Sequence, residues 1–237
     1  MNFHDAPAQA RHGLRRFVPA RVVQSQLHKR TYTQFAEKIG LVYFGYVDQR
    51  NDEHSLIRGL TVSTKHRDNH YCIGSFEGYD ISLVERTDTL HHPSKAAKSH
   101  TWMIMTLDLH RHVDLPHIFV GLHTHSEAFY AQLFTKFAHL SPVLPSDLRT
   151  YDPSFARHYT LYAKPEQAIS AERLFNHSMT AQIAETFGNI SIEISEGCLY
   201  LYLEDQKPTV ALLEKMLSRG LWLANCIDQQ ADVALEY

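Results

Sequence analysis

The sequence predicts an α+β fold in which a largely antiparallel sheet of about eight or nine strands packs with about four helices. Three observations lead to this prediction. Apolar and polar residues alternate in many short segments with brief connections, which is typical of antiparallel strands. Apolar residues recur at helical spacing near both ends of the chain. With 237 residues and 44% hydrophobic composition, the chain is long enough to bury a substantial core.

The first half of the chain predicts one helix followed by a run of strands. Apolar residues recur at helical spacing over 22–39, and Gly40 ends the pattern; the stripe is Val23, Leu27, Phe35 and Ile39. The period then changes to two, and we expect strands over 41–47, 59–64, 71–76, 79–85, 101–109 and 118–124. Glu77-Gly78 joins the third and fourth strands in a tight turn, where glycine can adopt a positive φ.

The second half of the chain mixes helices with strands. Ser126 caps a helix whose apolar stripe is Phe129, Leu133, Phe137 and Leu140. Prolines make 141–154 the best candidate for a surface loop or an internal boundary. A strand over 158–163 follows, and two further helices are expected to open at Pro165 and Ser178.

The clearest element is a hairpin over 190–204. Isoleucines and then leucines alternate with polar residues and tyrosines on the two sides of Glu196-Gly197, so we expect a hairpin with one buried face. Thr209 then caps a final helix that continues to Asp228. Apolar residues cover much of the circumference of this helix, which predicts that it packs into the core.

The chain divides into an N-terminal basic arm and helix, 1–40, and a single α+β domain, 41–237. The whole chain has 23 basic and 26 acidic residues and a formal net charge of −3, but the arm holds seven Lys/Arg against two acidic residues. Such arms can bind nucleic acid or anionic lipid. Because the basic residues are dispersed, we interpret the segment as a solvated helix docked on an acidic body, which disfavours nucleic acid as a partner.

Cysteine usage and hydropathy predict the compartment. Cys72, Cys198 and Cys226 are odd in number and far apart, so neither a disulfide framework nor a zinc ribbon is indicated. The N-terminus has no apolar stretch typical of a secretion signal, and no run approaches the roughly 18 apolar residues of a membrane span. We therefore expect a soluble, cytoplasmic protein without a membrane span.

Histidine is the most distinctive feature of the composition. There are 17 histidines, and the run His-Ile-Phe-Val-Gly-Leu-His-Thr-His begins at His117. Alternation along a strand places His117, His123 and His125 on one face. His123 and His125 are then spaced to place two imidazoles on one metal ion, as zinc or iron sites require. We expect a third ligand from one of four residues, namely His110, His112, Asp114 and His158.

This pair resembles the zinc strand of JAMM-type metalloproteases, in which a hydrophobic strand ends in His-Ser/Thr-His. That pattern places a serine and then an acidic ligand after the second histidine, where this chain has Leu133 and Lys136. The cupin pattern also fails, because His117 stands where a glycine is expected. The sequence therefore favours ordinary polar histidines on a strand face over a metal site.

Several segments resemble an uncharacterised bacterial family of unknown function. The matching features are a glycine–aromatic–glycine pattern with its strand at 74–83, the strand after Leu115-Pro116, and hydrophobic residues at Phe155, Tyr159, Leu161, Leu174, Phe175, 192–193 and 199–202. They extend over about 70–225 and specify a fold rather than chemistry. The resemblance implies an accessory or binding domain and carries no catalytic residue.

Other catalytic templates are missing from the sequence. No P-loop, GxGxxG, CxxC or GxSxG motif occurs, and no carboxylates are spaced for acid–base catalysis. We therefore predict a non-catalytic binding or accessory protein without a cofactor, whose partner is a protein or a small molecule. Two alternatives stay open. One is a histidine-liganded, metal-dependent hydrolase centred on His123 and His125, with zinc as the metal. The other is a pH-responsive interaction protein, because histidine titrates near pH 6.5.

Overall fold

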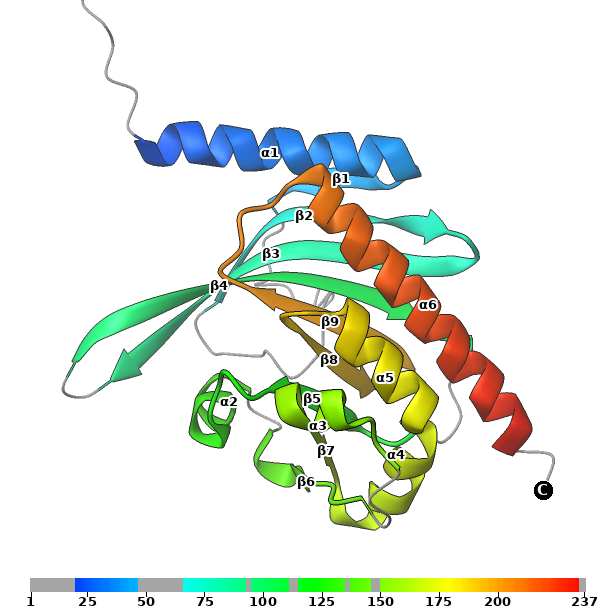
Figure 1. Cartoon of the computed structure of the whole chain (residues 1–237). Coiled ribbons are helices and arrows are strands. Elements are labelled where there is room, and N and C mark those ends of the chain that lie inside the picture. The colour runs from blue at the N-terminus through cyan, green and yellow to red at the C-terminus, as the bar shows by residue number, and fades with distance from the viewer. Residues whose placement is uncertain are drawn as a thin grey trace, which may run out of the picture.

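One antiparallel sheet forms the frame of the molecule (Figure 1). The computed structural model describes residues 20–46, 66–92, 95–110, 115–134, 137–145 and 150–234. Its nine strands in these residues are β1 (Val42–Gly45), β2 (His66–Phe76), β3 (Tyr79–His92), β4 (Lys95–Asp108), β5 (Ile118–Leu122), β6 (Ser141–Pro142), β7 (Tyr159–Ala163), β8 (Ile190–Ser195) and β9 (Cys198–Glu204). They are ordered β1-β2-β3-β4-β9-β8-β5-β7-β6, with antiparallel neighbours throughout. The predicted fold class and strand number are confirmed.

Six α-helices accompany the sheet in the described residues, somewhat more than the about four expected. They are α1 (Ala20–Ile39), α2 (Glu127–Leu133), α3 (Pro153–His158), α4 (Ala168–Leu174), α5 (His177–Thr186) and α6 (Val210–Ala234). Helix α3 was not predicted, because it begins inside the proline-rich segment. The Asp152 side chain accepts a hydrogen bond from the Ser154 N–H at 2.7 Å, and Pro153 occupies the first turn, where no N–H is needed.

Both faces of the sheet are covered. One core contains buried residues of α1, α3, α4, α5 and α6, and α6 runs diagonally across its face of the sheet (Figure 1). The other core is mainly aromatic and includes residues of α2 and the short 3-10 turn Phe137–His139. Every residue of β8 is buried, which corrects the expectation of a hairpin with one buried face. Tyr200 and Tyr202 on β9 belong to the aromatic core.

Several predicted strands differ in length from the observed ones. β3 and β4 are longer than predicted because their backbone pairing continues beyond the apolar pattern, and the end of this hairpin extends past the rest of the sheet (Figure 1). β5 is shorter and ends at Leu122, so His123 and His125 follow the strand rather than lying on it. The predicted strand 59–64 and the start of the basic arm, 1–19, lie outside the described residues.

Helix α1 buries part of the predicted stripe, namely Phe35 with the partly buried Ile39, together with Tyr32 and Ala36, which the prediction did not include. Tyr32, Phe35 and Ala36 are almost completely buried, whereas Leu27 is 58% exposed. The described core residues of α1 lie in its C-terminal half, and the helix contacts β1, β2 and α6.

The three cysteines are free thiols, and burial raises the pKa of Cys72 and of Cys198 to about 12. Asp108 accepts a hydrogen bond from Cys198 Sγ at 3.1 Å and also raises the pKa of this thiol. We expect iodoacetamide near pH 8 to label both thiols more than about tenfold more slowly in the native than in the denatured protein. Asp108→Asn should accelerate labelling of Cys198 alone, as measured by peptide mass spectrometry; equal acceleration at Cys72 would contradict this assignment.

Candidate functional site

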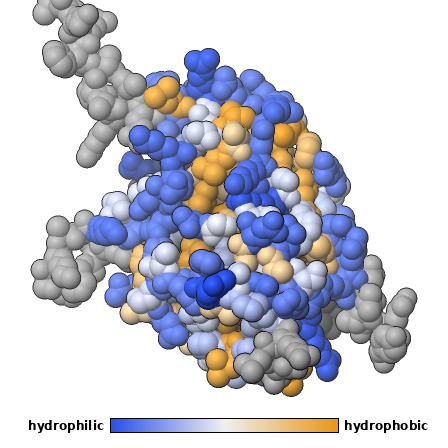
Figure 2. Space-filling view, in the orientation of Figure 1, coloured by the Kyte–Doolittle hydropathy of each residue, from blue (hydrophilic) through white to orange (hydrophobic). Residues whose placement is uncertain are grey.

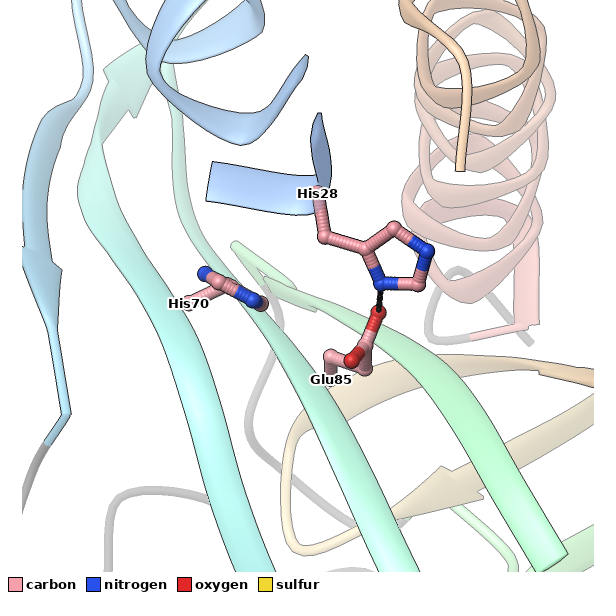
Figure 3. A group of neighbouring side chains, drawn as sticks. All are labelled: His28, His70 and Glu85. Carbon is pink, nitrogen blue, oxygen red and sulfur yellow. Dashed lines mark hydrogen bonds and ion pairs between the residues drawn. The ribbon is translucent and has the colours of Figure 1, made fainter. Parts of the chain in front are cut away.

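Three side chains from three separate elements converge where α1 passes over β2 and β3 (Figure 3). They are His28 on α1, His70 on β2 and Glu85 on β3, and one candidate ligand atom of each lies within 4.8 Å of the others. His28 Nδ1 donates to Glu85 Oε2 at 2.9 Å. The group is one of two such clusters of metal-capable side chains in the described part of the chain.

The helical repeat directs His28 toward the sheet. His28 lies four residues before Tyr32, and residues with this spacing share one face of a helix. Tyr32 is fully buried, and its hydroxyl contacts the same Glu85 oxygen at 3.5 Å. Packing of the Tyr32 side chain therefore also sets the direction of the His28 side chain.

A β-bulge in β2 positions His70. The register between β2 and β3 shifts between Asn69 and Cys72, and His70 has a φ of 56°. A left-handed conformation in a residue other than glycine costs on the order of 1 kcal/mol or more, and it persists only where the surroundings fix it. Bulges commonly redirect a side chain in this way next to binding sites.

Two tyrosines hold the His70 ring in place. The Tyr43 hydroxyl lies 2.9 Å from His70 Nδ1. The Tyr32 ring stacks on the imidazole with centroids 5.0 Å apart and an interplanar angle of 10°. A ring that is bonded at one edge and stacked on one face keeps a single orientation, as a ligand in a preorganised site must.

Burial controls the protonation of the site. Burial, together with the nearby positive charges of His28 and Lys29, lowers the pKa of His70 to about 4. Its imidazole is therefore neutral near pH 7 and available as an electron-pair donor. Burial raises the pKa of Glu85, and His28 opposes this shift. The site thus combines a neutral imidazole with a carboxyl group that is largely removed from water.

The three side chains line a polar cavity of about 560 Å³. All ten lining residues are polar or charged: Ser25, His28, Arg67, Asn69, His70, Glu85, Thr101, Asp205, Gln206 and Lys207. They come from α1, β2, β3, β4 and the connection between β9 and α6. A wholly polar lining is suited to a ligand that forms several hydrogen bonds or carries charge.

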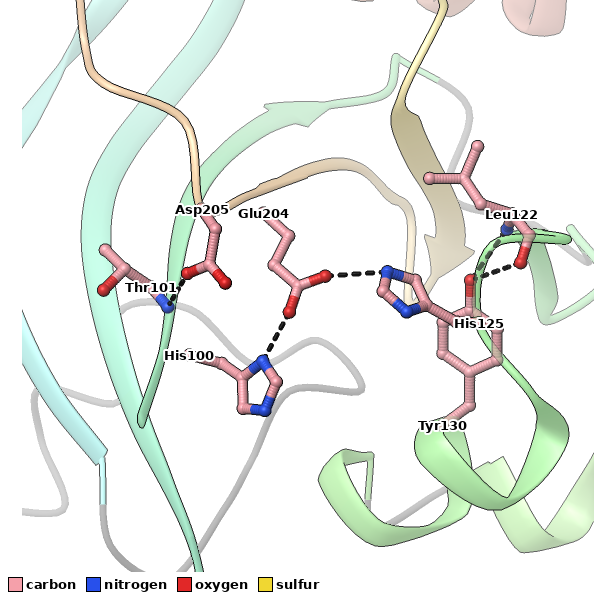
Figure 4. Close-up of polar contacts among 7 residues, drawn as sticks. All are labelled: His100, Thr101, Leu122, His125, Tyr130, Glu204 and Asp205. Carbon is pink, nitrogen blue, oxygen red and sulfur yellow. Dashed lines mark hydrogen bonds and ion pairs between the residues drawn. The ribbon is translucent and has the colours of Figure 1, made fainter. Parts of the chain in front are cut away.

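A second polar cluster lies beside this cavity and joins β4, β9 and the loop before α2 (Figure 4). The Glu204 carboxylate accepts a hydrogen bond from His100 Nδ1 at 2.5 Å, and its other oxygen lies 2.7 Å from His125 Nε2. The next residue, Asp205, accepts from the Thr101 N–H at 2.9 Å. His125 also stacks on Phe129 with ring centroids 4.0 Å apart. These contacts tie the loop before α2 to the middle of the sheet.

Replacing Glu204 by glutamine tests this connection. Glutamine replaces one carboxylate oxygen by an amide NH₂ group, so only one of the two histidines can still donate to an oxygen there. We expect Glu204→Gln to lower the free energy of unfolding by about 1–3 kcal/mol in urea denaturation. Glu214→Gln, which alters an exposed pair with Lys38, should change it by less than about 1 kcal/mol. Equal losses in the two variants would show that Glu204 does not connect the elements.

The structure gives the predicted histidines separate partners. Both ring nitrogens of His123 are engaged, with Arg157 O at 3.0 Å and Thr160 Oγ1 at 2.8 Å. His117 Nε2 lies 3.0 Å from Glu193 Oε1, and His125 pairs with Glu204. None of the three has a third histidine or carboxylate ligand within the distance that defines the two clusters of the described residues. A metal ion on His123 and His125 stays a prediction.

The two proposed third ligands among the described residues, His110 and His158, also have other partners. His110 stacks on Tyr79 with centroids 4.3 Å apart, and its Nδ1 lies 3.4 Å from Asp228. His158 Nδ1 lies 2.7 Å from Ser154 O. The other two candidates, His112 and Asp114, are outside the described residues.

The converging residues were not predicted from the sequence. Sequence motifs for metal and acid–base sites place residues at fixed spacings within one element, whereas His28, His70 and Glu85 come from three elements. One signal was present in the chain. His28 lies one helical turn before Tyr32, in a helix whose apolar face was expected to pack on the body of the protein.

A further hollow of about 550 Å³ lies between the end of α1, the β2–β3 turn and α6. Its hydrophobic lining residues are Ile39, Phe76, Tyr79, Leu217, Leu221 and Trp222. Figure 2 shows hydrophobic side chains at the surface alongside α6. This hollow brings together few groups that could perform chemistry, so the polar cavity is the stronger candidate site.

Comparison with known proteins identifies a similar fold. Neither a protein-family model nor a curated protein matches the chain. The crystal structure of the mycobacterial trehalose monomycolate transport factor A, TtfA, is similar to it with a TM-score of 0.52 at 11% sequence identity. The match covers 85% of this chain and 93% of TtfA. At this identity the similarity concerns the fold alone. No described helix is both long and apolar enough to cross a membrane.

Proposed function

We propose that the protein is a non-catalytic accessory protein that binds a small, anionic polar ligand in the cavity between α1 and the sheet. The observation that carries this proposal is the polar lining of the cavity, in which no apolar side chain takes part. Arg67 and Lys207 supply positive charge at the cavity, and Ser25, Asn69 and Gln206 supply hydrogen-bonding groups. Guanidinium and ammonium groups are the usual partners of carboxylates and phosphates.

Fold and cysteine chemistry support the same role. TtfA, which has a similar fold, is named as a transport factor. The free thiols Cys72, Cys198 and Cys226 are compatible with a reducing compartment, so we place the binding function in the bacterial cytoplasm.

Thermal shift measurements on the full chain test the proposal, with inorganic phosphate, citrate, glutamate and AMP as probes. We expect at least one probe to raise the melting temperature, because a ligand that binds only the native state stabilises it. The double variant Arg67→Ala/Lys207→Ala should lose this shift. A matched control, Lys215→Ala on the exposed side of α6, should keep it. No shift in the wild-type chain, or an equal shift in the double variant, would contradict the proposal.

The pairing of histidines with carboxylates favours a pH-responsive interaction protein as a second candidate function. Five pairs occur among the described residues: His28–Glu85, His100–Glu204, His110–Asp228, His117–Glu193 and His125–Glu204. A protonated histidine forms an ion pair with its carboxylate, and gain or loss of that proton changes the charge where elements meet. Sedimentation from about pH 8 to about pH 5.5 should then show a change in association. One constant oligomeric state over this range would exclude the function.

A further inference from the structure

The donor set of His28, His70 and Glu85 matches the preferences of a zinc ion. Two imidazoles and one carboxylate form zinc sites in which the fourth tetrahedral position stays open to water or another ligand. All three residues project into one place from α1, β2 and β3 (Figure 3), with ligand atoms within 4.8 Å of one another. A set drawn from three elements can enclose an ion in a way that neighbouring residues on one strand cannot.

One of the three ligand pairs, His28 with Glu85, needs little rearrangement, and the ligand atom of His70 lies within 4.8 Å of both. Tetrahedral ligands about 2.0–2.1 Å from zinc lie about 3.3 Å from each other. His28 Nδ1 and Glu85 Oε2 are already 2.9 Å apart, held by a shared proton. An ion can therefore replace this proton if the two side chains separate by a few tenths of an ångström.

The surroundings of His70 resemble the support that metal-bound histidines receive. In the tautomer in which Nδ1–H donates to the Tyr43 oxygen, Nε2 carries the lone pair that a metal requires. Stacking on Tyr32 fixes the plane of the ring. The bulge that places His70 costs backbone strain, so the arrangement is more than a chance encounter of surface side chains.

The second cluster of the described residues, His100 with Glu204 and Asp205, is less suited to an ion. Both Glu204 oxygens already have partners: one accepts a hydrogen bond from His100, and the other lies 2.7 Å from His125 Nε2. Asp205 accepts from the Thr101 N–H. Binding an ion there would require these structural contacts to be broken, whereas at the first cluster the ion replaces one shared proton.

We propose that His28, His70 and Glu85 bind one divalent transition metal ion, Zn²⁺ by the chemistry of the set, with its open position toward the polar cavity. This inference rests on the proposed function, because both place the binding site in the same cavity. It deepens that function by adding a metal ion to the site. An anionic ligand held by Arg67 and Lys207 would then complete the coordination of the ion.

Calorimetric titration of Zn²⁺ into the full chain, after EDTA treatment and dialysis, tests this proposal. We expect one ion per chain in the wild type and affinity at least about 100-fold weaker in His28→Ala and Glu85→Gln. The matched control is the double variant His123→Ala/His125→Ala, which should keep both stoichiometry and affinity. Circular dichroism melts confirm that each variant is folded; the side chain that His28→Ala removes from α1 is 17% exposed.

Cobalt gives an independent readout. Co²⁺ bound by the wild type should show the intense visible absorption of a tetrahedral site, and His28→Ala should lose it.

Three results would overturn the metal site. They are no stoichiometric Zn²⁺ binding by the wild type, undiminished Zn²⁺ binding by Glu85→Gln, and loss of Zn²⁺ binding in the His123→Ala/His125→Ala control. If the wild type binds no zinc but anions still raise its melting temperature, only the metal site is overturned. If it binds zinc but no anion raises its melting temperature, the proposed anion-binding function is overturned and the metal site is retained.

Discussion

Asp68→Ala is expected to lower the free energy of unfolding by about 3–5 kcal/mol, because it leaves the buried Arg86 guanidinium without its main partner. Arg86 is 1% exposed, and its Nε and Nη2 donate to the two Asp68 oxygens, each at 2.7 Å. Asp88 also lies near this guanidinium and favours its charged form, but it does not replace the bidentate contact. Urea denaturation measures the loss.

The control for this prediction is Asp80→Ala, which removes an exposed carboxylate from the same β2–β3 hairpin. Its hydrogen bond with Ser75 is at the surface, so the change should be below about 1 kcal/mol. A loss below about 1 kcal/mol for Asp68→Ala as well would show that the buried pair contributes little.

The pair also matters for the candidate site. Asp68 and Arg86 face each other in the register of β2 and β3, two residues from the bulged His70. Arg67 and Asn69 line the cavity, so alternation along the strand directs Asp68 to the opposite face of the sheet. Loss of the ion pair is therefore expected to loosen the bulge that positions His70.

Phe119→Ala is expected to lower the free energy of unfolding by about 3–5 kcal/mol through loss of buried contacts and creation of a cavity. Phe119 is fully buried at the centre of the aromatic core. Its ring lies 5.0–6.3 Å, centroid to centroid, from four others, those of Tyr130, Phe134, Phe137 and Tyr162. Phe44→Ala serves as the matched control.

Phe44 is 58% exposed on β1, so its removal should change stability by less than about 1 kcal/mol. Urea denaturation gives both changes in the free energy of unfolding, from the shift of the midpoint at an unchanged dependence of the free energy on urea concentration. If Phe119→Ala lowered the free energy of unfolding no more than Phe44→Ala does, the aromatic cluster would not act as a core.

The periodicity of the sequence predicts much of the fold because each element has a local pattern. Alternation identified both strands of the 190–204 hairpin, and Thr209 marked the start of α6, where its side chain accepts from the Leu212 N–H at 3.1 Å. The second buried face of the hairpin was missed because Glu193 and Tyr202 appear polar in the sequence. In the structure they bond to each other inside the protein.

The candidate site was harder to predict because it depends on register. Continuing the observed pairing of Phe76 with Tyr79 residue by residue would place His70 opposite Glu85. The bulge shifts the register, so that Asn69 faces Glu85 and His70 turns toward α1. A one-residue change in register is decided by tertiary packing and by the buried ion pair nearby, and hydrophobic alternation does not encode it.

Anomalous diffraction at the zinc absorption edge, from crystals of the full chain grown with Zn²⁺, tests most directly whether α1 and the sheet form the proposed zinc site. A single strong peak is expected about 2.0–2.2 Å from ligand atoms of His28, His70 and Glu85. A peak between His123 and His125, or no peak near α1, would contradict it.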